Sequence, residues 1–321
     1  MAPPLTLLSF ADLNYPPSPP GRSRRNVIDP SRWCQQHLDA LKIDIAPHSQ
    51  VELKNVLFPS STAEEHAMKE ENFATIQGLL CTLQRPESSN PGFFGVAWTI
   101  SSFLSPSPWL RRGPTPIGYG NSHVLGAFVW LLNLITGPRT TMSIQRAQEQ
   151  FSLRILEYRN HTIGLLPDVC IVVRPRFGMA HCIPVFFPEI HRRARTALAP
   201  EIAFILACAQ QHFRTMDAHH HHHHHHHTTD NPPVLAFKQA VIMILRVSLK
   251  ATYFVSAAVT RSYLESVKRT GAPDAGLTVM RSPRWDLMTP EGRIGFFKGL
   301  KGVSDMMFPQ VVGEGEGGEK R

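Results

Sequence analysis

Two acids stand inside otherwise apolar stretches of this chain, in a setting that suits metal chemistry. Asp168 follows Pro167 and leads into the apolar run 169–173, and Glu189 lies near the end of a second apolar run, 182–190. A carboxylate in an apolar strand is costly to bury unless it is paired, protonated or bound to a metal. On adjacent strands the two side chains could converge on one hard divalent cation, because oxygen ligands suit such ions. The alternative is that both acids end strands and are solvated.

An imidazole and several guanidinium groups follow Glu189. The side-chain period of two along a strand places His191 on the same face as Glu189. An imidazole that is largely neutral at pH 7 could act as a general base or as a metal ligand. Arg192 and Arg193 come next, and we predict that they contact phosphate groups, the alternative being an exposed basic helix start.

The elements that must position these residues form a mixed α/β pattern. The runs 162–173 and 182–190 read as neighbouring strands, joined by a loop over 174–178. Pro200 stands at a plausible first helical position, and an apolar face follows it at Ile202, Ile205, Leu206, Ala209 and Phe213. Two further runs, 241–247 and 253–259, are rich in β-branched and aromatic residues and predict strands. Long helices over 234–267 remain an alternative to these strands.

Pro167-Asp168 and Glu189-Ile190-His191 together resemble the motif of the PD-(D/E)XK nuclease-like superfamily, which includes many uncharacterised fungal members. The resemblance covers roughly residues 150–300. It implies a restriction-endonuclease-like core, a mixed sheet flanked by helices, with an N-terminal mainly helical extension. It also implies Mg²⁺ held by Asp168 and Glu189, and nucleic acid as substrate or partner.

The chain departs from the family motif at two positions. His191 replaces the family lysine, so a fixed positive charge is lost, and Pro188 precedes Glu189 although proline is unusual in a central strand. Two hypotheses therefore stay open. One is a metal-dependent nuclease in which Asp168, Glu189 and His191 are catalytic. The other is a non-catalytic binding or scaffold protein on the same fold.

An upstream acid often completes sites of this kind, and the sequence does not choose among its candidates. Each of them could equally be a solvated acid on a helix face. The candidates are Glu157, Glu149, Glu64, Glu65, Glu70 and Glu71.

Composition and punctuation divide the chain into parts. We predict a disordered Pro-rich arm over 1–30, a mainly helical region over 31–138, the α/β core over 139–308, and a disordered tail over 309–321. Within the helical region, 62–80 and 124–135 predict helices, the second one buried. The core carries a His-rich loop over 217–233, with nine consecutive histidines from His219 to His227. The tract could bind metals or be a repeat expansion without function.

The overall balance of residues narrows the class of protein. Of the 321 residues, 42% are hydrophobic and 18% are charged, and the net charge is +8. This composition excludes a wholly disordered or coiled-coil chain. Five cysteines without CxxC spacing favour a reducing compartment, nuclear or cytoplasmic. The uncharged stretches 88–110 and 113–138 are interrupted by prolines, so we predict no membrane span. A membrane-surface role for 88–138 is the weakest alternative.

Overall fold

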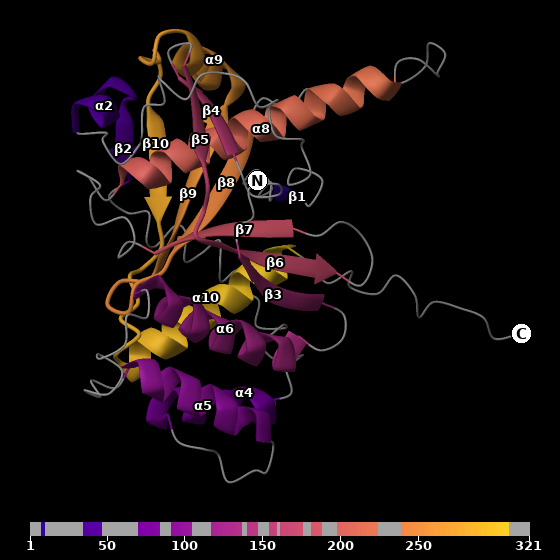
Figure 1. Cartoon of the computed structure of the whole chain (residues 1–321), viewed down its shortest axis with the longest axis vertical. Helices are drawn as coiled ribbons and strands as arrows, with labels where there is room; N and C mark the ends of the chain where they lie inside the picture. Colours follow the sequence, from indigo (N-terminus) through magenta and orange to yellow (C-terminus); the bar gives the residue numbers. More distant parts are fainter. Residues whose placement is uncertain are drawn as a thin grey trace, which may run out of the picture.

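A mixed β-sheet with helices on both faces organises the chain, as the computed structural model shows in Figure 1. Its strand order is β2-β10-β9-β8-β7-β6-β3, and β1 pairs with β7. The structure describes residues 8–9, 35–46, 70–83, 91–104, 117–136, 140–146, 154–158, 161–175, 181–187, 198–223 and 239–307. The strands of the sheet are β1 (Leu8–Ser9), β2 (Ile43–Ile45), β3 (Thr140–Arg146), β6 (Val169–Pro175), β7 (His181–Phe186), β8 (Gln239–Arg246), β9 (Tyr253–Thr260) and β10 (Leu277–Arg281).

Strand directions follow from the connections. The hairpin β6–β7 is antiparallel, and so are the pairs β3–β6, β8–β9 and β9–β10. By contrast, β7 and β8 run parallel, and the helix α8 (Ala199–His223) lies between them in the chain. A parallel pair requires such a crossover, because the chain must return to the starting edge before the second strand begins.

Side chains alternate between two apolar cores, one on each face of the sheet. On β8, Ile242 and Ile244 pack toward α8, whereas Met243 and Leu245 pack toward the opposite layer. Both faces are therefore covered, which explains why the strand is a continuous apolar run without polar alternation. The predicted strands 241–247 and 253–259 are confirmed, and the helical alternative is wrong for residues 239–260.

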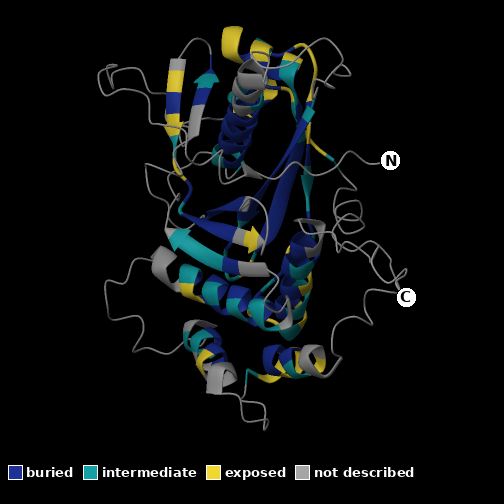
Figure 2. Cartoon of the chain, turned by 90° about the vertical axis from the view of Figure 1, so that its right-hand side faces the viewer, coloured by how far each residue is buried: buried dark blue, intermediate teal, exposed yellow. Residues whose placement is uncertain are grey.

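Helices and a small hairpin form the outer layers, and burial is greatest along the central strands and α8 (Figure 2). One layer contains α8, α9 (Arg261–Arg269), the short α2 (Gln35–Ala40) and the hairpin of β4 (Arg154–Tyr158) and β5 (His161–Leu165). The other contains α4 (Glu70–Thr82), α5 (Pro91–Leu104), α6 (Ile117–Thr136) and α10 (Pro290–Met307). The predicted buried helix over 124–135 is confirmed within α6, and Pro200 lies in the first turn of α8 as expected.

Glycines let α10 lie directly against Trp285. A Cβ atom on Gly295 would lie 2.5 Å from Cδ1 of the Trp285 ring, and one on Gly299 would lie 2.8 Å from Cη2 of the same ring. Trp285 also exchanges backbone hydrogen bonds with Thr252 at 2.8 and 3.0 Å. The backbone of Trp285 therefore holds the segment after β10 beside the start of β9, while its indole packs against α10.

The buried guanidinium of Arg293 joins α10 to α4. It donates hydrogen bonds to the carbonyl oxygens of Leu80 and Cys81 at 2.6 and 3.1 Å, and to those of Leu287 and Met288 at 3.1 Å. Carbonyls in the last turn of a helix lack partners within the helix. Arg293 satisfies two of them, so it is a structural clamp.

Several predicted boundaries need correction. The region 31–138, predicted to be mainly helical, also contains a strand, because Ile43–Ile45 forms β2, a parallel partner of β10 that local sequence could not reveal. The predicted strand 162–173 is two strands, interrupted around Pro167, which has no N–H to donate.

The two predicted non-regular segments near the ends of the core also change. Leu8–Ser9 pairs with β7, so these two residues of the predicted arm are ordered. The predicted loop 217–233 begins later, since α8 continues to His223. The other residues of the arm lie outside the described residues. So do residues 62–69 of the predicted helix, residues 224–233 of the predicted loop, and the tail 309–321.

Candidate functional site

Asp168 and a buried acid, Glu201, lie at the same end of the central strands. Here β7, β8 and β10 end, at Phe186, Arg246 and Arg281, while β6 and β9 begin. The first turn of α8 also lies over this edge, because Glu201 contacts Arg246. In open α/β sheets, ligands bind outside the carboxyl ends of parallel strands such as β7 and β8. We refer to this region as the strand-end edge.

Asp168 lies at this edge, directly before β6. The register that pairs Val169 with Val185 puts Asp168 opposite Phe186, and its backbone N–H donates to the carbonyl oxygen of Val185 at 3.0 Å. Its side-chain Oδ2 accepts a hydrogen bond from the backbone N–H of Phe187 at 2.7 Å. Asp168 therefore holds the end of β7 and remains partly exposed.

The partners that sequence analysis assigned to Asp168 lie just beyond β7. Glu189, His191, Arg192 and Arg193 are outside the described residues, so their positions relative to Asp168 stay predictions. Glu189 follows the last described residue of this segment, Phe187, by two positions.

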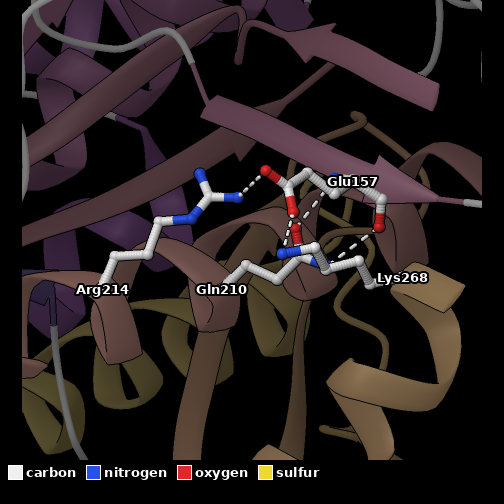
Figure 3. A network of polar contacts seen from close by, with 4 residues as sticks. All are labelled: Glu157, Gln210, Arg214 and Lys268. Atoms are coloured by element: carbon white, nitrogen blue, oxygen red, sulfur yellow. Dashed lines mark hydrogen bonds and ion pairs between the residues drawn. The ribbon is translucent and has the colours of Figure 1, made fainter. Parts of the chain in front are cut away.

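The candidate upstream acid Glu157 is held in a structural network instead (Figure 3). One carboxylate oxygen is 2.8 Å from Nη2 of Arg214, and the other is 2.8 Å from Nζ of Lys268. The side-chain amide of Gln210 hydrogen-bonds with the backbone N–H and carbonyl of Glu157 at 2.8 and 3.0 Å. The network ties β4 to α8 and α9, a role that accounts for both Glu157 and Gln210.

The protonation of Glu157 agrees with this role. Burial alone would raise the pKa of its carboxyl group, but the ammonium of Lys268 and the guanidinium of Arg214 outweigh burial and lower the pKa. A carboxylate shared by two cations is a poor candidate for a third metal ligand. Of the remaining candidates, Glu70 and Glu71 belong to α4, in the layer on the opposite side of the sheet from α8, and Glu64, Glu65 and Glu149 lie outside the described residues.

A second acid, Glu201, was not singled out by the sequence and is almost completely buried at the strand-end edge. Its side chain is 2% exposed, and its Oε1 is hydrogen-bonded to Nη1 of Arg246. Its Oε2 is 3.7 Å from Nη2 of Arg281. Glu201 thus connects α8 to the ends of β8 and β10.

Three guanidinium groups surround the ring of Tyr253 beside Glu201. Their central carbons lie 5.7 Å (Arg246), 5.4 Å (Arg281) and 5.6 Å (Arg284) from the ring centroid, within cation–π range. Arg246 and Tyr253 are directly paired across β8 and β9. We call Glu201, Arg246, Tyr253, Arg281 and Arg284 the arginine–tyrosine cluster.

Burial governs the acidities within this cluster. It raises the pKa of Glu201, and the positive charges of Arg246 and Arg281 only partly offset the effect. Burial, followed by the charge of Glu201, also raises the pKa of Tyr253, so the phenol remains neutral. The cluster therefore combines three permanent positive charges with at most one negative charge.

A weak signal of the cluster was present in the sequence. Ile242, Ile244 and Arg246 share one face of β8, and Leu277, Val279 and Arg281 share one face of β10. Each arginine thus ends an apolar strand on its core-facing side. Only the register, however, shows that these strand ends meet at the same ring.

The described residues also contain four cysteines. Cys170, Cys182 and Cys208 are buried and Cys81 is exposed, and none of these four cysteines is joined in a disulfide. The described helices include none with the length and apolar character needed to cross a bilayer. Within the same residues, no group of three or more His, Cys, Asp or Glu side chains is arranged to hold a metal ion.

Comparison with known proteins assigns the chain to no family. No protein-family model matches the chain, and a search of curated proteins finds no match either.

Proposed function

We propose that this chain is a nuclease-like domain with a restriction-endonuclease-like core that acts on nucleic acid at the strand-end edge. The observation that carries the proposal is the order of elements around Asp168. An antiparallel hairpin, β6–β7, begins with Pro167-Asp168 and is followed by the crossover helix α8 and the parallel strand β8. This is the succession that the motif resemblance implies: the first acid, the second strand, and then a helix.

In this proposal Asp168 and Glu189 would hold Mg²⁺. Asp168 suits this role because its carboxylate is a partly exposed oxygen donor at a strand end, and Mg²⁺ prefers oxygen ligands. A bound Mg²⁺ supplies an activated water and offsets charge on a phosphate. The backbone N–H of Phe187 orients the carboxylate of Asp168 by binding Oδ2. His191 would accept a proton, and Arg192 and Arg193 would contact the phosphate backbone.

Substitution of Asp168 tests the proposal. An asparagine keeps an oxygen that can accept from Phe187 N–H but loses the negative charge, whereas alanine loses both. We expect Mg²⁺- or Mn²⁺-dependent cleavage of DNA or RNA by the natural chain. Asp168→Asn and Asp168→Ala should each lose about a hundredfold or more, because removing even an outer partner of a metal ligand typically costs about 10–100-fold. Only Asp168→Ala should also lower the melting temperature. Asp274→Asn, at an exposed position, is the matched control.

A second candidate function is nucleic-acid binding without catalysis. Two observations favour it: Oδ2 of Asp168 already serves the backbone of Phe187, and Glu157 is committed to Arg214 and Lys268. Under this alternative the natural chain binds oligonucleotides but cleaves none with any divalent ion, and Asp168→Asn leaves affinity unchanged. Absence of both cleavage and binding would overturn both candidates.

A further inference from the structure

We propose that the arginine–tyrosine cluster binds a terminal phosphate monoester, the 5′-phosphate of a nucleic-acid strand. The nucleic-acid part of this inference rests on the proposed function. The phosphate part rests on residues other than Asp168, Glu189 and His191, so the two proposals can fail separately.

The charge of the cluster calls for an anion. Arg246, Arg281 and Arg284 carry three positive charges around one ring, and the carboxylate of Glu201 faces Arg246 and Arg281. Arg246 and Arg281 are only 15% and 16% exposed, so water screens their mutual repulsion poorly. A dianionic group beside them would neutralise the excess of two charges.

Hydrogen-bonding capacity points the same way. Nε of Arg281 is buried and donates no hydrogen bond within the described part of the chain. Its Nη2 is 3.7 Å from Glu201, which is beyond hydrogen-bond distance. A buried donor without an acceptor costs free energy, and a phosphate oxygen is a strong acceptor for the planar guanidinium fork.

The residues of the cluster are held in place by the sheet, and one of them is exposed to solvent. Arg246, Tyr253 and Arg281 belong to adjacent strands of the sheet, and Arg284 precedes Trp285, which is fixed between Thr252 and α10. Arg284 is exposed, so it marks the side from which a ligand enters. Such fixed donors bind a phosphate without an ordering cost.

The amount of charge favours a monoester over a diester. A phosphate monoester carries about −1.5 to −2 at pH 7, whereas each internal phosphodiester of a strand carries about −1. An excess of at least two positive charges therefore matches the end of a strand better than its interior.

Binding of short single-stranded DNA, labelled at the 3′ end and measured by fluorescence anisotropy in EDTA, tests the inference. The natural chain should bind a 5′-phosphorylated strand about tenfold more tightly than the same strand with a 5′-hydroxyl, as expected for one charge-assisted contact set. Arg284→Gln, at an exposed position, should abolish that preference. Arg281→Gln should do the same, and Arg269→Gln, exposed at the end of α9, should preserve it.

Further arms separate the ligand sources and the two proposals. Inorganic phosphate and adenosine monophosphate should compete for the site, and Asp168→Asn should keep the 5′-phosphate preference while losing cleavage. Equal affinity for the 5′-phosphorylated and the 5′-hydroxyl strand overturns the inference even if cleavage is observed. A preference for the 5′-phosphate that survives Arg284→Gln also overturns it. If inorganic phosphate raises the melting temperature of the natural chain but not of Arg284→Gln, while no oligonucleotide binds, the phosphate site stands and the nucleic-acid ligand is rejected.

Discussion

Glu157 and Glu201 are both carboxylates that face two cationic side chains, and α8 contributes to both arrangements. Glu157 is 30% exposed and lies between Arg214 and Lys268, whereas Glu201 is 2% exposed and lies between Arg246 and Arg281. The pKa is lowered at Glu157 and raised at Glu201. Two cationic neighbours therefore control the pKa of the partly exposed carboxyl group, while burial controls the pKa of the enclosed one.

The difference also separates scaffold from candidate site. The cations around Glu157 are exposed to water, and they connect peripheral elements, β4, α8 and α9. Those around Glu201 are mostly buried and lie at the ends of the central strands, with a third guanidinium, that of Arg284, beside them. Water screens the excess positive charge around Glu157 but screens that around Glu201 poorly. We therefore assign ligand binding to the cluster around Glu201.

Removal of each carboxylate should give the largest contrast. Glu201→Ala leaves Arg246 and Arg281 without their acid, and losing one partner of a buried pair costs about 3–5 kcal/mol in the free energy of unfolding. Glu157→Ala should cost less than about 1 kcal/mol, because its pairs are exposed and screened. Urea denaturation measures both values. Similar losses for the two variants would contradict the assigned difference in burial.

Gly295→Ala should disturb only the Glu201 side of the comparison. A Cβ atom there must displace Trp285, the neighbour of Arg284, and overpacking of this kind costs about 1–3 kcal/mol. Gly78→Ala on α4 is the matched control: a Cβ atom there meets nothing within 4 Å, so it should stabilise the chain by about 0.5–1 kcal/mol. Thermal unfolding distinguishes the two. If Gly295→Ala were as harmless as Gly78→Ala, the close contact with Trp285 would be refuted.

The pH dependence of stability should have opposite signs at the two acids. Because the pKa of Glu201 is raised on folding, its contribution is fully present below the unfolded value of about 4.3 and falls as pH rises through the folded pKa. Because that of Glu157 is lowered, its contribution is present above about 4.3 and is lost as pH falls through the folded pKa. Unfolding free energies of Glu201→Gln and Glu157→Gln, measured against the natural chain from acidic to neutral pH, should diverge in opposite directions. Parallel curves would show that burial does not control Glu201.

The smallest expected effect concerns salt. Lys268→Met removes one of the two cations beside Glu157, and the loss should be about 0.5 kcal/mol at low ionic strength and smaller at 1 M salt, because exposed pairs are screened. Melting temperatures of the variant and the natural chain in low and high salt provide the measurement. A loss that does not change with salt would mean that the Glu157 network is less exposed than the structure shows.

Regular elements with a clear pattern of their own were predictable from the sequence. The apolar face after Pro200 specifies α8, and the β-branched runs specify β8 and β9, because each signal lies within one continuous segment. The apolar run 169–173 likewise predicted a strand. The position of Asp168 between two strands, and not inside one strand over 162–173, was not predictable, and neither was its register opposite Phe186.

Pairing between distant segments was decided only by the tertiary structure. The segment 43–45 is too short for its pattern to predict a strand. Its partner, β10, lies far away in the sequence. Glu201, Arg246, Tyr253 and Arg281 come from four elements, and each by itself reads as an ordinary strand-end or helix-start residue. Local sequence fixes the period of an element, but its neighbours and register depend on which apolar faces can be buried together. Each patterned run therefore specifies its own helix or strand, and together they give the α/β character, while the enclosure of the Glu201 carboxylate by two guanidinium groups, with a third beside the Tyr253 ring, arises only when the strands are paired.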